Sequence, residues 1–328
     1  MIHLNFSLQL VEFFIGHRTP LLVHLAEFVS FFGSAPCYAL LTLFLFVAWD
    51  KRVAIRVSAL ILLTMSLNDI LKLFIGNPRP FLAQGTYRQE WAVSPRDAAR
   101  LAAEYSTPSG HAMGSSAFYP YLASLTRNRF ARIVLFLAVA LIGISRPLLG
   151  VHYIEDVLLG WAIGLSIAFV AIRYGSRLFG LWSRFAHPAQ IATAVGASLA
   201  LFALAVVFRG GIDNQIRELV SNCGFFTGIA IAYPLEVRVV NFDPRSGGII
   251  VKAVRFFFTI AVFGVVLFGL KLAFRHIEND VTATGCALEY LRYVAADVAA
   301  MFFAPLIFCR TSLAKVSRDA EPLIQVAR

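Results

Sequence analysis

The stretch SRPLLGVHYIED, residues 145–156, joins two apolar runs at residues 134–144 and 157–172. Each run belongs to a segment long enough to cross a bilayer, which takes about 20 residues of helix. Between the runs lie one arginine, one histidine and two acids. Charged side chains beside hydrocarbon are costly, and in membrane proteins they usually serve function. The stretch therefore predicts two neighbouring membrane spans with a polar site at their junction.

Within this junction, the order of residues predicts an oriented histidine. Arg146 precedes Pro147, which disfavours a helical backbone at Arg146. A helix is expected to restart near Val151, so that His152 and Asp156 share one helix face. Asp156 would accept the proton on one ring nitrogen and leave a lone pair on the other. His152 is thus a candidate nucleophile or general base, and the alternative is a polar contact at a loop–helix junction.

The composition is that of a polytopic membrane protein. Of 328 residues, 59% are hydrophobic and 15% charged, and the mean hydropathy is +0.73. A soluble globular domain carries about 25% charged residues. The predicted fold class is all-α, a polytopic transmembrane helical bundle. The net charge of +10 comes from short arginine clusters between apolar runs, which indicates orientation in a membrane and argues against nucleic acid as a partner.

The apolar segments predict three regions. Residues 1–34 hold two short pieces, at 6–15 and 20–32, which are read as interfacial or re-entrant helices. Residues 35–184 hold the core, with spans expected at 36–49, 53–75, 109–125, 130–149 and 153–172. Residues 185–328 hold about three additional spans of unknown role, at 190–208, 254–274 and 282–308, while the apolar piece at 225–234 is too short to span.

Two further features stand out along the chain. In the polar loop at 76–107, Ser94 is expected to cap a short amphipathic helix that ends near Tyr105. The last span carries Glu289, Arg292 and Asp297. These side chains are expected to make a charged contact between helices, and the alternative is a second polar site.

The motif KLFIGNPRP closes the second span, with Lys72 and Arg79 seven residues apart. Seven residues are two helical turns, so both cations would share one face if the helix continued to Asn77. Arginine offers a two-pronged donor and lysine a point charge, a pair that suits an anion with several oxygens. The alternative is that both side chains reach toward lipid headgroups.

The motif TPSGH opens the third span. Thr107 or Ser109 is expected to cap this helix, with Pro108 in its first turn. Free N–H groups at a helix start bind anions, and Gly110 lets an oxyanion approach the backbone. His111 would lie at the same end with its ring available, and the alternative is an ordinary helix cap beside an interfacial histidine.

Counting spans places all three motifs on the same side of the membrane. The set joins three cations, a helix start and two histidines, one of which a carboxylate orients. Cations and backbone amides would hold phosphate oxygens, one imidazole would attack phosphorus, and the other would protonate the leaving group. Because no residues have metal-ligand spacing, no metal or other cofactor is expected and the cations would stabilise the developing charge.

These motifs, K-x6-R-P, P-S-G-H and S-R-x5-H-x3-D in this order, resemble those of the type 2 phosphatidic acid phosphatase (PAP2) superfamily. The resemblance covers roughly residues 20–180 and leaves 185–328 unexplained. It implies a helical bundle and a phosphohistidine intermediate on His152, with Asp156 orienting that ring and His111 as the leaving-group acid. It also implies that phosphate is bound by Lys72, Arg79, Ser109, Gly110 and Arg146.

The predicted function is a metal-independent membrane phosphatase for a lipid phosphate or diphosphate, such as an isoprenyl diphosphate, phosphatidic acid or phosphatidylglycerol phosphate. Its partners would be that lipid substrate and membrane lipids, and the motifs leave the oligomeric state open. One alternative is a lipid phosphotransferase that uses the same phosphohistidine. Another is a transporter or scaffold that uses the C-terminal spans.

The charges of the loops predict the orientation. On the side opposite the motifs, residues 50–56, 126–132 and 173–184 each hold three Lys or Arg side chains. Short loops rich in these residues stay in the cytoplasm. The chain is therefore expected in a bacterial inner membrane with the site facing the periplasm or exterior, and the alternative is the lumen of an organelle.

Overall fold

The computed structural model describes residues 8–85, 91, 101–102, 104–278 and 281–317. Within these ranges the regular structure is helical, apart from one isolated bridge between Phe242 and Val316. Seven of the helices described are long and apolar enough to cross a membrane, or eight if a bent pair at 20–48 forms one span. The predicted all-α transmembrane fold is confirmed, and the protein is an integral membrane protein.

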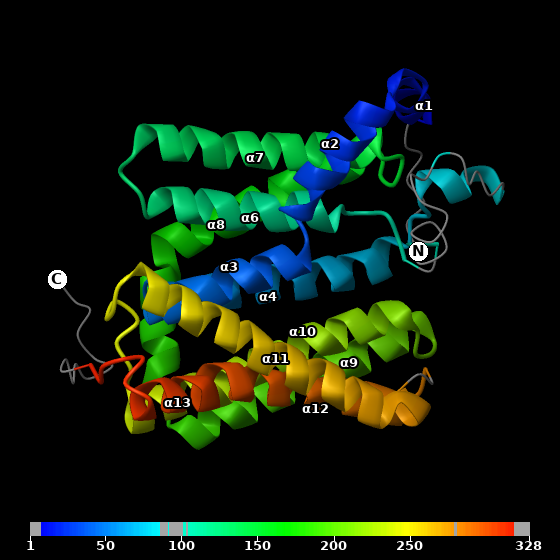
Figure 1. The fold of residues 1–328 in the computed structure, drawn as a ribbon. Coiled ribbons are helices and arrows are strands. Elements are labelled where there is room, and N and C mark those ends of the chain that lie inside the picture. The colour runs from blue at the N-terminus through cyan, green and yellow to red at the C-terminus, as the bar shows by residue number, and fades with distance from the viewer. Residues whose placement is uncertain (1–7, 86–90, 92–100, 103, 279–280, 318–328) are drawn as a thin grey trace. The chain divides into compact units, whose positions relative to one another are not determined.

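The described helices belong to two compact units (Figure 1). The first comprises Met1–Tyr38 and Leu63–Arg173, and the second comprises Ala39–Leu62 and Tyr174–Arg328. The domain boundaries expected near residues 34 and 184 stay predictions.

The first unit is built around α7 (Arg129–Leu148). The helix α6 (Gly110–Ser124) runs antiparallel beside it, and α1 (Leu8–His17) and α2 (Pro20–Phe31) also pack on it (Figure 1). The unit also contains the second half of α4 (Lys51–Ile75), the short helix η1 (Pro80–Gly85) and most of α8 (Ile154–Arg184). The two short N-terminal helices are those that the sequence predicts.

A small apolar cluster fixes the junction between α7 and α8. Val151 and Tyr153, the neighbours of His152, are both buried in it. The remaining buried members come from α1, α2, the α4–α6 connection and the residue after α7: Val11, Ala26, Phe81, Trp91, Leu101 and Leu149. His152 therefore projects from a backbone that is held by apolar packing on both sides.

The second unit packs α10 (Asn214–Leu235) against α9 (His187–Arg209) and α12 (Ala283–Val298), with α11 (Ile249–Glu278) on α12. Two π-helical turns, η3 (Glu236–Val240) and η4 (Ala299–Phe303), follow α10 and α12, and α13 (Ala304–Arg310) ends the last span.

Three expectations for this part of the chain are wrong. The piece at 225–234 belongs to a full candidate span from Asn214 to Val240, so the described part of 185–328 holds four candidate spans and not three. The first half of α10 is polar, so the apolar run is too short to predict a span. Its polar side chains can lie in a span because they bond to a neighbouring helix. The basic stretch at 173–184 is not a loop but the last turns of α8.

The charged contact expected in the last span is confirmed for Glu289. Its carboxylate accepts hydrogen bonds from Arg217 Nε at 2.6 Å and Ser221 Oγ at 3.0 Å, both on α10, and from Arg292 Nη2 at 3.4 Å. Asp297 lies instead against Gly228, where an added Cβ would come within 2.6 Å of the Asp297 Cβ. The contact therefore joins α10 to α12.

Most of the amphipathic helix expected from Ser94 to about Tyr105 lies outside the described residues.

Candidate active site

The junction between α7 and α8 differs from the predicted break. The helix α7 continues through Arg146 and Pro147 to Leu148, so the expectation of a non-helical Arg146 is wrong. Pro147 lacks the N–H that would bond to the carbonyl of Gly143, and the helix ends one residue later, at Leu148. Gly150 then adopts a φ of +71°, a conformation that glycine accommodates without strain.

His152 lies in the turn before α8, not on its face as predicted. The expected contact is nevertheless confirmed, with His152 Nδ1 3.3 Å from Asp156 Oδ2. Asp156 is the third residue of α8, and its Oδ2 also accepts the backbone N–H of Tyr153 at 2.9 Å. An acid at this position commonly bonds back to the residue before the helix. The start of α8 thus orients the carboxylate toward the ring.

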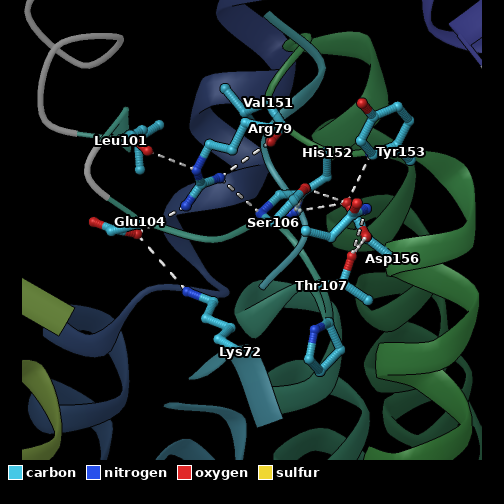
Figure 2. Close-up of polar contacts among 12 residues, drawn as sticks. Lys72, Arg79, Leu101, Glu104, Ser106, Thr107, Val151, His152, Tyr153 and Asp156 are labelled. Carbon is cyan, nitrogen blue, oxygen red and sulfur yellow. Dashed lines mark hydrogen bonds and ion pairs between the residues drawn. The ribbon is translucent and has the colours of Figure 1, made fainter. Parts of the chain in front are cut away.

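Two hydroxyl groups that the sequence analysis missed also hold Asp156 (Figure 2). Ser106 Oγ donates to Asp156 Oδ2 and lies 3.3 Å from His152 Nδ1. Thr107 Oγ1 donates to Asp156 Oδ1 at 2.5 Å and accepts a bond from Asn77 Nδ2 at 3.1 Å. With Tyr153, these groups satisfy both carboxylate oxygens.

Arg79 lies on the other side of the ring. Its Nη1 donates to Val151 O at 3.1 Å and lies 3.2 Å from His152 Nε2, while its Nε donates to Leu101 O at 3.0 Å. A guanidinium has donors but no acceptor. The contact therefore fits a ring whose Nε2 carries the lone pair and whose Nδ1 carries the proton, the arrangement that Asp156 also favours.

Lys72 and Arg79 meet at a carboxylate that was not predicted. Glu104 Oε2 accepts a hydrogen bond from Arg79 Nη2 at 2.8 Å and lies 3.8 Å from Lys72 Nζ. The helix α4 ends at Ile75 and Gly76 has a φ of +65°, so the two cations do not share a helix face as expected. They come together because the chain turns back after the helix ends.

The second motif forms the start of α6. Ser109 is the residue before the helix, as one of the two expectations had it, but its hydroxyl makes no capping bond. Its Oγ is buried and has no hydrogen-bond partner among the residues described. Thr107 is not a cap and Pro108 precedes the helix, so those two expectations are wrong. An added Cβ at Gly110 would lie 3.1 Å from Asn68 Oδ1, so glycine permits close packing on α4.

The N-terminal helices contribute to the site more than the sequence suggested. Arg146 Nη1 donates to Ser30 Oγ of α2 at 2.5 Å. An added Cβ at Gly33, just after α2, would lie 3.2 Å from the His111 ring. The bond of Tyr119 to the carbonyl of Phe32, at 2.7 Å, fixes the same turn. The α2 end therefore covers Arg146 and His111.

The charge around His152 favours its neutral form. The residue lies in the turn between α7 and α8 and is buried. Burial, with the nearby charges of Arg79, Arg146 and Lys72, holds the pKa of His152 well below its ordinary value. The ring is therefore neutral near pH 7 and keeps the lone pair that a nucleophile needs. Among the residues described, no three His, Cys, Asp or Glu side chains are grouped as metal ligands.

The arrangement brings together most of the residues that the motifs predicted. Lys72, Arg79 and His152 surround one buried region with Asp156 behind the ring, and the charges of Lys72, Arg79 and Arg146 reach His111. Ser106 and Thr107 had a signal in the sequence, since they directly precede the second motif. Glu104 and Ser30 had none, because an acid in a polar loop and a serine in an apolar helix are ordinary residues.

Two relatives with known names resemble this chain. Phosphatidylglycerophosphatase B of Bacillus subtilis (strain 168) is 28% identical over 121 residues, which are 34% of this chain and 53% of that protein. Undecaprenyl-diphosphatase of Sulfolobus acidocaldarius is 27% identical over 179 residues, which are 53% of this chain and 81% of that protein. The chain thus spans about half the length of the first relative.

Two crystal structures are also similar. That of a transmembrane PAP2 type phosphatidylglycerolphosphate phosphatase from Bacillus subtilis has a TM-score of 0.43 and 22% identity, over 52% of this chain and 84% of that one. That of Aquifex aeolicus LpxE has a TM-score of 0.42 and 25% identity, over 53% of this chain and all of that one, 100%.

Family models identify both parts of the chain. The PAP2 superfamily model matches residues 53–180, which contain all three motifs. A second model, PAP2 superfamily phosphatase, transmembrane extension, matches residues 220–316, the part that the motifs left unexplained. The two matched ranges and the motif residues gathered around His152 show that the chain belongs to the PAP2 superfamily.

Proposed function

We propose that this protein is an integral-membrane phosphatase that hydrolyses a lipid phosphate or diphosphate through a phosphohistidine on His152. The observation that carries the proposal is the orientation of this ring. Its Nδ1 faces Asp156 Oδ2 at 3.3 Å, and its Nε2 lies 3.2 Å from Arg79 Nη1. A neutral, oriented imidazole beside a phosphate-binding cation suits nucleophilic attack on phosphorus.

In the first step, the Nε2 lone pair of His152 attacks phosphorus and forms a P–N bond. The P–O bond to the lipid breaks, and its electron pair stays on the leaving oxygen. His111 gives that oxygen a proton, so the lipid leaves as an alcohol, or as a monophosphate when the substrate is a diphosphate. The proton on His152 Nδ1 stays there, and Asp156 stabilises the positive charge that develops on the ring.

In the second step, water attacks the phosphohistidine. His111, now neutral, accepts a proton from this water. The P–N bond breaks with its electron pair returning to His152 Nε2, and inorganic phosphate is released. Each histidine ends in the protonation state in which it began, so the cycle is closed without another reactant.

Cations and helix-start groups would stabilise the phosphoryl oxygens in both steps. We assign this role to Lys72, Arg79 and Arg146, together with the Ser109 hydroxyl and the backbone N–H of Gly110. The buried Ser109 Oγ supports the assignment, because a buried hydroxyl with no partner among the described residues is a rare and costly feature unless a ligand uses it.

The substrate class follows from the setting of the site. It lies at the ends of membrane helices, where a lipid could present its phosphate while its chain stays among the apolar side chains. One relative is named for a lipid monophosphate and the other for an isoprenoid diphosphate, which supports a lipid phosphate or diphosphate as the substrate. The charge of the loops supports a site that faces the cell exterior, or the periplasm if the membrane is a bacterial inner membrane.

A panel of lipid phosphates tests this proposal. The purified protein in detergent, with EDTA present, is expected to release inorganic phosphate from at least one of undecaprenyl diphosphate, phosphatidic acid and phosphatidylglycerol phosphate. Activity lost to EDTA and restored by Mg²⁺ would contradict the metal-independent chemistry. Transfer of label to a second lipid without free phosphate would instead support a phosphotransferase.

A further inference from the structure

The carboxylate of Glu104 is bound by two of the cations assigned to phosphate. Its Oε2 accepts a hydrogen bond from Arg79 Nη2 at 2.8 Å and lies 3.8 Å from Lys72 Nζ. The side chains of Glu104, Arg79 and Lys72 are only 9%, 2% and 6% exposed. Figure 2 shows the carboxylate reaching from one cation to the other. Such a shielded contact is stronger than an exposed ion pair.

A carboxylate and a phosphate are recognised by the same donors in the same geometry. A phosphoryl oxygen that binds Arg79 Nη2 and Lys72 Nζ would therefore compete with Glu104 Oε2 for those two groups. Asp156, the second acid of the site, lies behind His152 and bonds to hydroxyl and backbone groups.

We propose that Glu104 is an internal competitor of phosphate: substrate must displace its carboxylate from Arg79 and Lys72 to bind, and the carboxylate returns when inorganic phosphate leaves. This rests on the proposed phosphatase function. Three buried cations would otherwise bind inorganic phosphate tightly and slow its release. The carboxylate lowers that affinity, so free phosphate can leave, while a lipid substrate still binds because its chain adds binding energy.

The main alternative is that Glu104 only holds Arg79 in place. Two other contacts already fix this guanidinium, from Nε to Leu101 O at 3.0 Å and from Nη1 to Val151 O at 3.1 Å. Both acceptors are backbone carbonyls of residues in the buried apolar cluster. Arg79 is therefore oriented without Glu104, and the two roles predict opposite effects of removing the carboxylate charge.

The test is direct binding of radiolabelled inorganic phosphate to the full-length protein in detergent, a readout that needs no turnover. Glu104→Gln keeps the size of the side chain and removes its charge. Because a charge-assisted hydrogen bond competes with the ligand, we expect the Kd for phosphate to fall roughly tenfold or more. Glu27→Gln is the matched control, since Glu27 is an exposed acid on α2, and its Kd should equal that of the wild type.

A Glu104→Gln Kd that is unchanged or higher than that of the wild type would overturn the proposal, as would no phosphate binding to either protein. If Glu104→Gln does not yield a monodisperse protein, Glu104→Asp serves instead. Its shorter carboxylate should bind both cations less well, and the Kd should fall by a smaller factor. Tighter phosphate binding without hydrolysis of any lipid would refute the proposed function alone. Hydrolysis with an unchanged Kd would refute this inference alone.

Discussion

His152 Nε2 lies 3.2 Å from Arg79 Nη1, a donor that cannot accept a proton. The contact and the carboxylate behind Nδ1 favour the same tautomer. The contact with Arg79 also places this guanidinium beside Nε2, the nitrogen that would attack phosphorus. An oxygen of the phosphoryl group that His152 attacks would therefore lie within reach of Arg79, so the two residues are expected to act on one phosphoryl group.

Replacing the nucleophile gives the first prediction. His152→Ala is expected to abolish turnover, because no other group can form the P–N bond. The wild type, mixed with labelled substrate and quenched rapidly, should carry label that is stable to base and released by acid. The variant should elute like the wild type on size exclusion and carry no label. More than a few per cent of residual activity would contradict the mechanism.

Removing a hydroxyl that holds Asp156 gives the second prediction. Ser106→Ala deletes a donor to the carboxylate and leaves the other contacts of Asp156 in place. A hydrogen bond to a charged group contributes about 1.5–3 kcal/mol, so kcat should fall roughly 10- to 100-fold. Ser106→Thr, which keeps the hydroxyl, should recover much of the loss.

A matched control distinguishes this role from a general loss of stability. Ser124→Ala also removes a serine hydroxyl in the same unit, one that bonds only to the carbonyl of Tyr121 at the end of α6. It should leave kcat unchanged. If Ser106→Ala matches this control, the hydroxyl does not orient Asp156.

The sequence predicted which candidate catalytic residues lie together better than it predicted the residues that contact them. The contact between His152 and Asp156 followed from spacing alone, although His152 lies in the turn before α8 and only Asp156 lies in the helix. Ser106 and Glu104 reach the site because the α4–α6 connection folds back over it. No periodicity reports such a fold, so the contact of Glu104 was not predictable, and the one signal for Ser106 was its place beside the second motif.

The same limit explains the missed span. A membrane span is predicted from the length of a continuous apolar run. The first half of α10 fails this criterion because it contains Arg217 and Ser221. Both side chains bond to Glu289 of α12, so their polarity is satisfied inside the bundle. Partners on another helix, which a single segment does not reveal, decide whether a polar residue can lie in a span.

The pH dependence of activity gives the third prediction. His152 must be neutral to attack, and burial together with Arg79, Arg146 and Lys72 lowers its pKa. The ring therefore stays neutral as the pH falls below the ordinary histidine value of about 6.5. Activity should persist below that value and be lost only when the pH falls past the lowered pKa.

The measurement is kcat/KM against pH for two substrates whose phosphate groups titrate differently. A fall in kcat/KM that reflects titration of the substrate occurs at a different pH for each substrate. A fall that reflects protonation of His152 occurs at the same pH for both. An enzyme limb at or above about 6.5 on which activity falls as the pH falls would contradict the neutral-ring arrangement.

The role of His111 gives the fourth prediction. If it protonates the leaving group, His111→Ala should impair an alkyl phosphate far more than nitrophenyl phosphate, whose leaving group needs no proton. General acid catalysis contributes roughly 10²–10⁴-fold, and the two losses should differ by a factor on this scale. Equal losses on both substrates would rule out the assignment.

The last prediction is that the site faces away from the cytoplasm. The helix α7 runs 20 residues from Arg129 to the turn that holds His152, about 30 Å in a straight helix, so its two ends lie at opposite membrane faces. Arg127, Arg129 and Arg132 lie at the far end, and no acid accompanies them between residues 126 and 132. Short loops rich in Lys and Arg stay in the cytoplasm, which leaves the His152 end outside. The test uses single cysteines in a protein whose four native cysteines are replaced by alanine. A cysteine at Arg88, which lies between the first two motifs in the sequence, should react with a membrane-impermeant maleimide on intact cells. A cysteine at Arg129, which is exposed at the start of α7, should react only after the cells are lysed. The reverse pattern would place the chemistry in the cytoplasm, where the site would meet lipid phosphates of the inner leaflet.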